Sequence, residues 1–192
     1  MLDLRDKVLE KVVLKQLMNH IKINKLLSDH QSAYRPGHST ETVLVRILND
    51  ALTSLDQDKV SALLHLDLSA AFDTVDHNIL LTRLSDVFGI GGTALCWFRS
   101  YLLHRKQYVV VDSHKSSETP VHFGVPQGSV LGPVLFTLYT TPLSHLIDSH
   151  KLRHEMYADD TQLFQSSCPG DYNTLTQSLQ ECFRHKTLDV SK

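Results

Sequence analysis

Apolar residues return every three or four positions in several segments, which predicts amphipathic helices. The first spans residues 3–22, and its apolar positions are Leu4, Val8, Val12, Leu17 and Ile21. A second helix is predicted to begin at Ser39-Thr40-Glu41, residue types that suit a helix N-terminus, and to continue to Leu55. The same spacing recurs at 77–88 and 92–103, residues 128–147 are apolar enough for a buried helix, and a final helix is predicted to begin near Asp171.

Other segments have the shorter period of strands. Residues 60–68 are short and aliphatic and predict a mostly buried strand. Residues 107–112 and 119–123 predict two strands around a polar turn at 113–118, and residues 152–164 predict a hairpin around Ala158-Asp159-Asp160. Strands that are mixed with helices and joined by hairpins indicate an α+β fold.

Composition narrows the class of protein without revealing a partner. The 192 residues include 19 Lys and Arg, 21 Asp and Glu, 12 His and three Cys, with a net charge of −2. This length suits one compact domain, or one domain and part of a second. No apolar run approaches the ~18 residues needed to span a bilayer. The N-terminus does not have the pattern of a secretory signal, so we expect an intracellular protein without a membrane segment.

The cysteines argue against two further classes of protein, and the net charge does not indicate a partner. Cys96, Cys168 and Cys182 form no close pair, which argues against a disulfide framework and a zinc ribbon. A net charge near zero leaves no basic footprint for nucleic acid, so such a role must come from a local site.

Three acidic residues stand in unexpected positions. Asp67 ends the strand that is predicted to be buried, where a lone carboxylate costs several kcal/mol. Asp159 and Asp160 are adjacent at the tip of an apolar hairpin, where their mutual repulsion favours a bound cation. Three carboxylates around divalent ions suit two-metal phosphoryl transfer. The alternative is that Asp67 caps the next segment and the acid pair is a solvated turn.

Three blocks carry a resemblance to a known family. They are Leu66-Asp67-Leu68-Ser69-Ala70-Ala71-Phe72, Gly124-Val125-Pro126-Gln127-Gly128-Ser129-Val130-Leu131-Gly132 and Tyr157-Ala158-Asp159-Asp160. In this order and at these distances they resemble the reverse transcriptase of non-LTR (LINE-like) retrotransposons. The resemblance covers about residues 1–168 and includes residues 29–40, which look like the family's fingers segment.

The resemblance implies a right-hand polymerase palm with part of the fingers and with the thumb missing. By this interpretation residues 1–58 are a partial fingers-like region, residues 59–168 are the palm with the catalytic motifs, and residues 169–192 are a truncated C-terminal helix. The family's upstream basic stretch and its endonuclease would also be missing. We therefore expect the chain alone to be a weak or inactive polymerase.

The resemblance also implies roles for single residues. Asp67, Asp159 and Asp160 match the catalytic acids, and with the main-chain carbonyl of Leu68 they would hold two Mg²⁺ ions, or Mn²⁺. Phe72 would exclude a ribose 2′-hydroxyl by its bulk, which selects deoxynucleotides.

The implied partners are an RNA template, a DNA primer and dNTPs. Gln127 and Gly128 match the segment beside the template base and the incoming nucleotide, where Gly128 would permit close backbone approach. Arg35 is either a contact to triphosphate or template, or an ordinary turn arginine. The oligomeric state is not indicated.

Other interpretations remain open or are set aside. The chain could be an inactive remnant that only binds nucleic acid or protein, or a different template-copying enzyme such as a group II intron maturase or an RNA polymerase. Gly89-Ile90-Gly91-Gly92-Thr93-Ala94 fits a dinucleotide fingerprint, but it follows a helical pattern and is better explained as one helix end and the next helix start. Asp76 is better explained as a helix cap, and His65 as structural.

Overall fold

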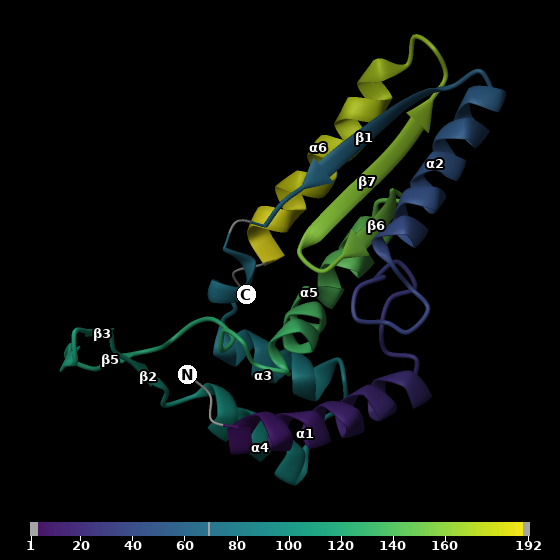
Figure 1. Ribbon diagram of the computed structural model, residues 1–192. Coiled ribbons are helices and arrows are strands. Elements are labelled where there is room, and N and C mark those ends of the chain that lie inside the picture. The colour runs from purple at the N-terminus through teal and green to yellow at the C-terminus, as the bar shows by residue number, and fades with distance from the viewer. Residues whose placement is uncertain (1–3, 69, 190–192) are drawn as a thin grey trace. The chain divides into compact units, whose positions relative to one another are not determined.

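The structure is a computed structural model that describes residues 4–68 and 70–189. It mixes helices and strands, in agreement with the predicted α+β class (Figure 1). In chain order the elements are α1 (Leu4–Ile23), α2 (Thr40–Asp56), β1 (Val60–Leu66), the 3-10 helix η1 (Ala71–Asp73), α3 (His77–Asp86), α4 (Gly92–Leu102), β2 (Lys106–Gln107), β3 (Val110–Val111), β4 (His114–Lys115), β5 (Thr119–Pro120), α5 (Gly132–Ser149), β6 (Arg153–Tyr157), β7 (Asp160–Ser167) and α6 (Tyr172–Asp189).

Polar side chains fix several helix starts, as the sequence predicts. The Ser39 hydroxyl accepts a hydrogen bond from the backbone N–H of Thr42, and the Thr42 hydroxyl accepts one from the N–H of Ser39, which begins α2. The Asp76 carboxylate accepts from the N–H groups of Asn78 and Ile79 at 2.8 and 3.0 Å, which begins α3. The prediction that Asp76 is a cap is therefore confirmed.

The chain folds into two compact units, each built from two separate segments. Unit 1 comprises Met1–Leu26 and Ala70–Tyr139, and unit 2 comprises Leu27–Ser69 and Thr140–Lys192. These units are groups of residues in mutual contact, whereas the predicted boundaries at residues 58 and 168 separate polymerase subdomains. The predicted boundaries stay a prediction.

Unit 2 contains an antiparallel three-stranded sheet in the order β1-β7-β6. One face of β1 packs through Leu64 and Leu66 against a buried cluster from α5, the loop before β6, β7 and α6 (Ile147, Leu152, Leu163 and Cys182). Burial of these aliphatic side chains stabilises the sheet by ~25 cal/mol per Å² of apolar surface removed from water.

The prediction that residues 60–68 form a mostly buried strand is wrong. Exposed and half-buried residues alternate along β1, and Leu63 keeps 57% of its surface exposed. The reason is that the buried cluster packs against Leu64 and Leu66, whereas Leu63 lies on the opposite face of the strand. The period-2 alternation of a half-covered strand was hidden in the sequence by Leu63, an apolar residue on the open face.

Unit 1 is held together by helix packing around large apolar residues. Its fully buried side chains come from α3, α4 and the start of α5, and include Leu80, Leu84, Phe88, Leu102 and Leu135. The His20 imidazole on α1 lies 2.7 Å from the carbonyl oxygen of Phe88, which links α1 to the turn after α3.

The glycine motif at residues 89–94 lies between two helices. Gly89 follows α3 with φ +64 and Gly91 caps α4, so the interpretation as one helix end and the next helix start is confirmed.

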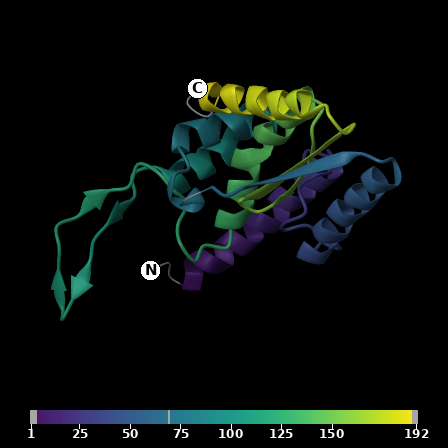
Figure 2. The same ribbon diagram turned by 90° about the horizontal axis from the view of Figure 1, so that it is seen from above.

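The hairpin of unit 1 differs from the prediction. Residues 107–112 do not form one strand, since β2 pairs with β5 and β3 pairs with β4 as two short ladders. The turn lies at Asp112 and Ser113, both with positive φ, and not at 113–118. Figure 2 shows a narrow ribbon with no helix against it, and all residues of these four strands are exposed. Because neither face of this hairpin is packed, a longer ladder would bury no apolar surface, and the ladders stay short.

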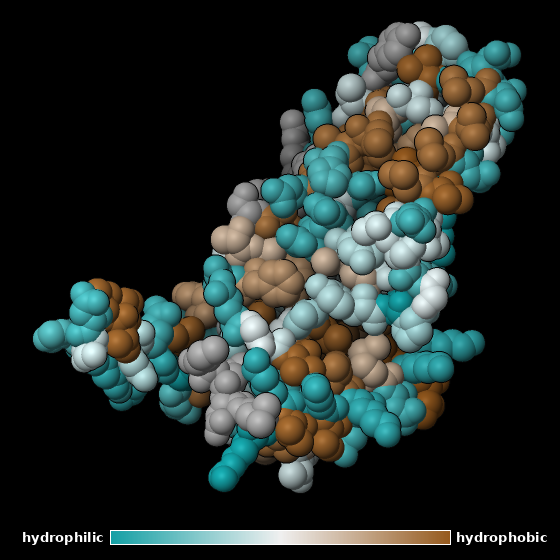
Figure 3. All heavy atoms as spheres, viewed as in Figure 1, coloured by the Kyte–Doolittle hydropathy of each residue, from teal (hydrophilic) through white to brown (hydrophobic). Residues whose placement is uncertain are grey.

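Unit 2 also carries apolar side chains at its surface. Figure 3 shows them gathered over the region of α2, where the exposed large residues are Leu44, Val45, Leu48, Leu52 and Leu55. Within the described residues, no helix is both long and apolar enough to cross a bilayer.

Candidate active site

The three predicted catalytic acids lie at one end of the unit 2 sheet. Asp67 directly follows β1, Asp159 is in the two-residue loop between β6 and β7, and Asp160 is the first residue of β7. The β1–β7 register pairs Leu66 with Thr161, so its continuation by one residue places Asp67 opposite Asp160. In Figure 1 the tip of β1 and the beginning of β7 are at the same end of the sheet. The fold therefore brings together acids that are about ninety residues apart in the sequence.

The hairpin that carries the acid pair has a strained first loop residue. Tyr157 pairs with Asp160, which leaves Ala158 and Asp159 as the loop and confirms the predicted hairpin. Ala158 has φ +57, in the left-handed region that costs a residue with a Cβ ~1 kcal/mol or more. Tight two-residue hairpins require positive φ, so this turn holds Asp159 at its tip at a local conformational cost.

The expectation of a buried carboxylate at Asp67 is wrong. Asp67 is exposed, and Asp159 and Asp160 are half-buried. Asp67 is exposed because it continues the open face of the edge strand β1. The feature that points to a cation is therefore the clustering of negative charge and not the burial of one carboxylate.

Two side chains that the sequence analysis did not assign to the site lie beside the acids. The His65 Nε2 atom is 3.2 Å from Asp160 Oδ1, with both side chains about half exposed. The phenol of Tyr34 is near Asp159. Burial raises the Tyr34 pKa, and the charges of Asp159 and Tyr157 raise it further. Tyr34 has φ +58, an unusual conformation for an aromatic residue that could not be read from its sequence neighbours.

Arg35 binds its own loop in the described structure. Its Nη1 donates to the carbonyl oxygens of Ser28 and Gln31 at 2.8 and 3.2 Å, and its Nη2 is 3.7 Å from the Asp29 carboxylate. These contacts are those of an ordinary turn arginine, which is the second of the two roles predicted for Arg35. Its contact to triphosphate or template stays a prediction.

The predicted sugar-contacting residue lies in unit 1. Phe72 is in η1, and its ring is tilted against the ring of Phe136 with centroids 4.8 Å apart. The Phe72 carbonyl oxygen accepts from the N–H of Val125 at 2.9 Å, so the first two of the three sequence blocks are hydrogen-bonded to each other.

Two glycines of the second block are required for different physical reasons. A Cβ on Gly124 would lie 3.1 Å from the Asp73 backbone, and Gly124 has φ +87, so both space and conformation require glycine there. Gly128 has φ +73, but a Cβ there would meet no atom within 4 Å. Backbone conformation alone therefore favours glycine at position 128. The close approach of the Gly128 backbone to a nucleotide stays a prediction.

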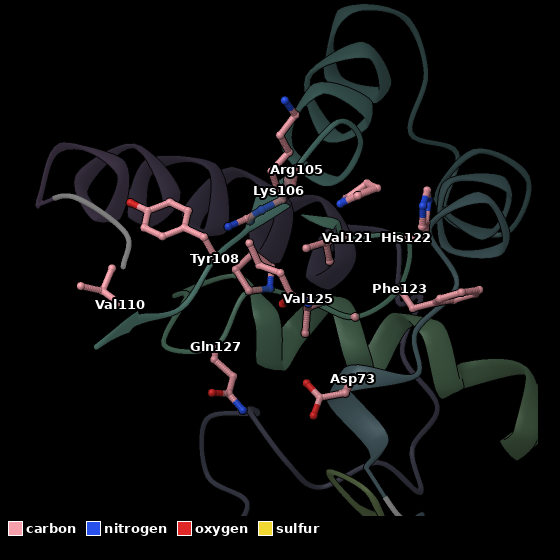
Figure 4. Close-up of a pocket in the computed structure, with 14 residues that line it drawn as sticks. Asp73, Arg105, Lys106, Tyr108, Val110, Val121, His122, Phe123, Val125 and Gln127 are labelled. Atoms are coloured by element: carbon pink, nitrogen blue, oxygen red, sulfur yellow. The ribbon is translucent and has the colours of Figure 1, made fainter. Parts of the chain in front are cut away.

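A pocket in unit 1 opens beside these residues. Figure 4 shows its lining, in which Gln127 and Asp73 stand on one side and Arg105, Lys106 and Tyr108 on the other. Basic and aromatic side chains together with an amide suit phosphate and base contacts. The exposed side chain of Gln127 lines this pocket, whereas Gly128 does not.

Comparison with known proteins now identifies the class. The reverse transcriptase (RNA-dependent DNA polymerase) family matches residues 1–192, and the chain belongs to this family. It is 32% identical over 180 residues to a probable RNA-directed DNA polymerase from transposon BS of Drosophila melanogaster, covering 91% of this chain and 19% of the relative. It is also 32% identical over 167 residues to the RNA-directed DNA polymerase from mobile element jockey of Drosophila melanogaster, covering 84% and 18%. The predicted resemblance is thereby confirmed, and the chain spans about a fifth of the length of these relatives.

Solved structures support the fold. Apo telomerase from Candida tropicalis, truncated from its C-terminal domain, matches with a TM-score of 0.65 at 15% identity, over 92% of this chain and 36% of that chain. Telomerase from Candida albicans in complex with a telomeric RNA fragment matches with a TM-score of 0.63 at 13% identity, over 89% and 31%. At these identities the likeness concerns the fold alone, which is similar to that of the telomerase reverse transcriptase.

Proposed function

We propose that this chain carries the catalytic palm of an RNA-directed DNA polymerase, with part of the fingers. The reaction is the template-directed addition of a deoxynucleotide to a primer 3′-hydroxyl, with release of pyrophosphate. The observation that carries the proposal is the β1–β7 register, which brings Asp67 opposite Asp160 and next to the hairpin tip that bears Asp159. Family membership supports the same reaction.

The donor set at this sheet end fits divalent cations. Three carboxylates within reach of solvent offer the hard oxygen ligands that Mg²⁺ prefers, and Mn²⁺ accepts the same donors. The carbonyl oxygen of Leu68, immediately after Asp67, would be a fourth oxygen. When bound, two such ions would activate the primer hydroxyl and neutralise charge on the transferred phosphoryl group.

The residues of the chain itself hold these ligands in place. The strand pairing fixes Asp160 and Leu66, the residue before Asp67, and the tight turn fixes Asp159. His65 supplies a partner for Asp160 that limits repulsion among the acids whenever its imidazole is protonated. Phosphoryl transfer needs positioning and charge neutralisation more than a protein nucleophile, so no histidine or cysteine nucleophile is required.

Residues of unit 1 are proposed to handle the substrates. From the family resemblance, Phe72 excludes the ribose 2′-hydroxyl, and Gln127 and Gly128 contact the nucleotide and the template base. An RNA template, a DNA primer and dNTPs are the proposed partners. The pocket lined by Gln127, Arg105 and Lys106 supports contacts of this chemistry.

Primer extension tests the proposal. Because the chain spans about a fifth of its relatives, residues 1–192 replace the matching segment of the jockey polymerase in a chimaera. We expect Mg²⁺-dependent incorporation of dNTPs on an RNA template, and a loss of at least ~100-fold in the Asp159→Asn variant, as for the removal of other charge-stabilising groups. The matched control is Asp58→Asn, an exposed acid in the α2–β1 turn that should leave the rate unchanged.

Two results would contradict this function. Full extension by the Asp159→Asn chimaera would remove the acids from catalysis. A second result would be a folded chimaera that binds template but extends no primer. If substitution of the three acids left its template binding unchanged, the inactive binding module would be favoured instead.

A further inference from the structure

A second group of side chains that could bind a metal lies in unit 2 and includes none of the proposed catalytic acids. His30 is in the loop before α2, Asp148 is near the end of α5, and His154 is on β6. One ligand atom from each lies within 4.8 Å of the others. Asp148 Oδ1 is 3.9 Å from His30 Nε2 and 3.7 Å from His154 Nδ1. The two imidazole rings are 4.3 Å apart between centroids.

The buried member of the group has a ring nitrogen without a partner. The side chain of His154 is fully buried, and its Nδ1 has no hydrogen-bond partner although it faces Asp148. Its other nitrogen, Nε2, is 2.7 Å from the Ser144 hydroxyl. With the proton on Nε2 donated to Ser144, the Nδ1 lone pair points toward Asp148. Since a buried polar atom without a partner is costly, this arrangement needs a further atom between the two groups.

The neighbours of His30 orient it toward the same point. Glu155 Oε1 is 3.8 Å from His30 Nδ1, on the opposite side of the ring from the nitrogen that faces Asp148. Arg46 holds this carboxylate with Nη1–oxygen distances of 3.1 and 3.3 Å. At 3.8 Å this is a charge contact and not a hydrogen bond, and it favours the tautomer with the proton on Nδ1, which leaves Nε2 to face Asp148.

The backbone brings His30 and β6 together independently of the side chains. The N–H of Met156 donates to the His30 carbonyl oxygen at 2.8 Å, and the N–H of Ser32 donates to the Met156 carbonyl oxygen at 2.9 Å. The two histidines are therefore held side by side before any ion binds, which lowers the entropic cost of assembling the site.

We propose that His30, Asp148 and His154 bind a transition-metal ion, Zn²⁺ as the reference ion. Two imidazoles and one carboxylate favour Zn²⁺ over Mg²⁺. Tetrahedral ligand atoms around zinc are about 3.3 Å apart, so on binding the two Asp148 distances close by about half an ångström and the widest separation closes by up to about 1.5 Å. The side chains of His30 and Asp148 are 40% and 50% exposed, so water completes the fourth position. The ion pins the loop before α2 to α5 and β6.

Metal binding to the purified, tag-free chain tests this site. Zinc is titrated against a chromophoric chelator in the presence of excess Mg²⁺, and Co²⁺ is added as a visible probe. We expect one zinc per chain, a tetrahedral cobalt spectrum without thiolate charge-transfer bands, and a higher midpoint of thermal unfolding with zinc. His30→Ala and Asp148→Ala should each abolish these three effects. Both side chains are partly exposed, so these variants retain the fold, which circular dichroism verifies.

Further variants separate the site from its surroundings. Glu155→Gln should weaken zinc binding by ten- to a hundredfold, as is usual for a group behind a ligand histidine. His114→Ala, an exposed histidine of the unit 1 hairpin, should leave binding unchanged, and so should Asp159→Asn. The last variant distinguishes this site from the proposed catalytic acids. Failure to bind zinc, binding that survives His30→Ala and Asp148→Ala, or a thiolate band from the cysteines would overturn the assignment.

Discussion

The carboxylate of Glu10 accepts a hydrogen bond from the Tyr101 hydroxyl at 2.9 Å, although the two residues are far apart in the sequence. Its other oxygen accepts from the backbone N–H of Val130. Glu10 is 1% exposed, and burial raises the pKa of Tyr101, so the phenol remains a donor. One carboxylate thus joins α1, α4 and the segment that leads into α5.

Removal of the Glu10 carboxylate should therefore destabilise unit 1. Glu10→Ala removes the acceptor of the half-buried Tyr101 hydroxyl and of the Val130 N–H, and we expect a loss of about 2–4 kcal/mol in the free energy of unfolding. Glu10→Gln keeps one acceptor oxygen and should lose less. Urea denaturation measures both, with Lys11→Ala as an exposed control on the same helix. Equal stabilities for Glu10→Ala and Lys11→Ala would refute the role of this carboxylate.

A pair of glycine variants separates crowding from backbone conformation. Gly124 and Gly128 both have positive φ, but only at Gly124 would a Cβ meet the backbone, at 3.1 Å from Asp73. We expect Gly128→Ala to cost about 1 kcal/mol and Gly124→Ala to cost at least about 2 kcal/mol more. Thermal unfolding of the two variants measures the difference, and similar midpoints would show that the crowding at Gly124 is relieved.

The stability of the metal-free protein should depend on the state of His154. Burial, and then His30, lower the pKa of His154 to about 4, against the opposing effect of Asp148. The unfolded chain takes up this proton near pH 6.5, so stability present above that pH is lost as the pH falls toward 4. The expected loss approaches about 3 kcal/mol.

Urea denaturation in EDTA between pH 7 and 4 measures this dependence. His154→Gln should reduce the slope of stability against pH, because carboxylates titrate in both proteins and cancel in the comparison. Parallel curves for the two proteins would show that His154 is protonated as easily in the folded state as in the unfolded one.

Substitution of Phe72 tests the proposed sugar selection. In the jockey chimaera, Phe72→Val should raise the use of ribonucleotides by about ten- to a hundredfold relative to deoxynucleotides, since removal of the ring opens space for a 2′-hydroxyl. Single-nucleotide incorporation with dNTP and rNTP gives the ratio of kcat/KM. Phe136→Leu, which removes the ring that is tilted against Phe72, is the control for general loosening of the packing. An unchanged ratio in Phe72→Val would remove this residue from sugar selection.

The sequence was sufficient where local signals decide the structure. Caps such as Ser39 and Asp76, and the hairpin around Ala158, follow from residue types at short range, and the structure has them. The resemblance named the family correctly. The roles of the acids, Phe72, Gln127 and Gly128 stay predictions that the geometry supports to different degrees.

The sequence was insufficient where tertiary contacts decide. Glu10 reads as one more polar residue of an amphipathic helix, yet it is buried by partners on α4 and before α5. Leu63 has the side chain of a core residue, yet it is exposed because it lies on the face of β1 opposite the buried cluster. His30 and His154 are 124 residues apart, so no spacing rule could pair them.

The chain leaves unit 2 after Ser69 and returns to it at Thr140. Consequently the separation of Asp67 from Asp159 along the sequence does not set their separation in space, which the pairing of β1 with β7 determines. The length of the segment between them does not enter this pairing, whereas one extra residue within either strand would turn every following side chain to the opposite face. The tolerance of this polymerase fold to variation is thus sharply uneven along its length.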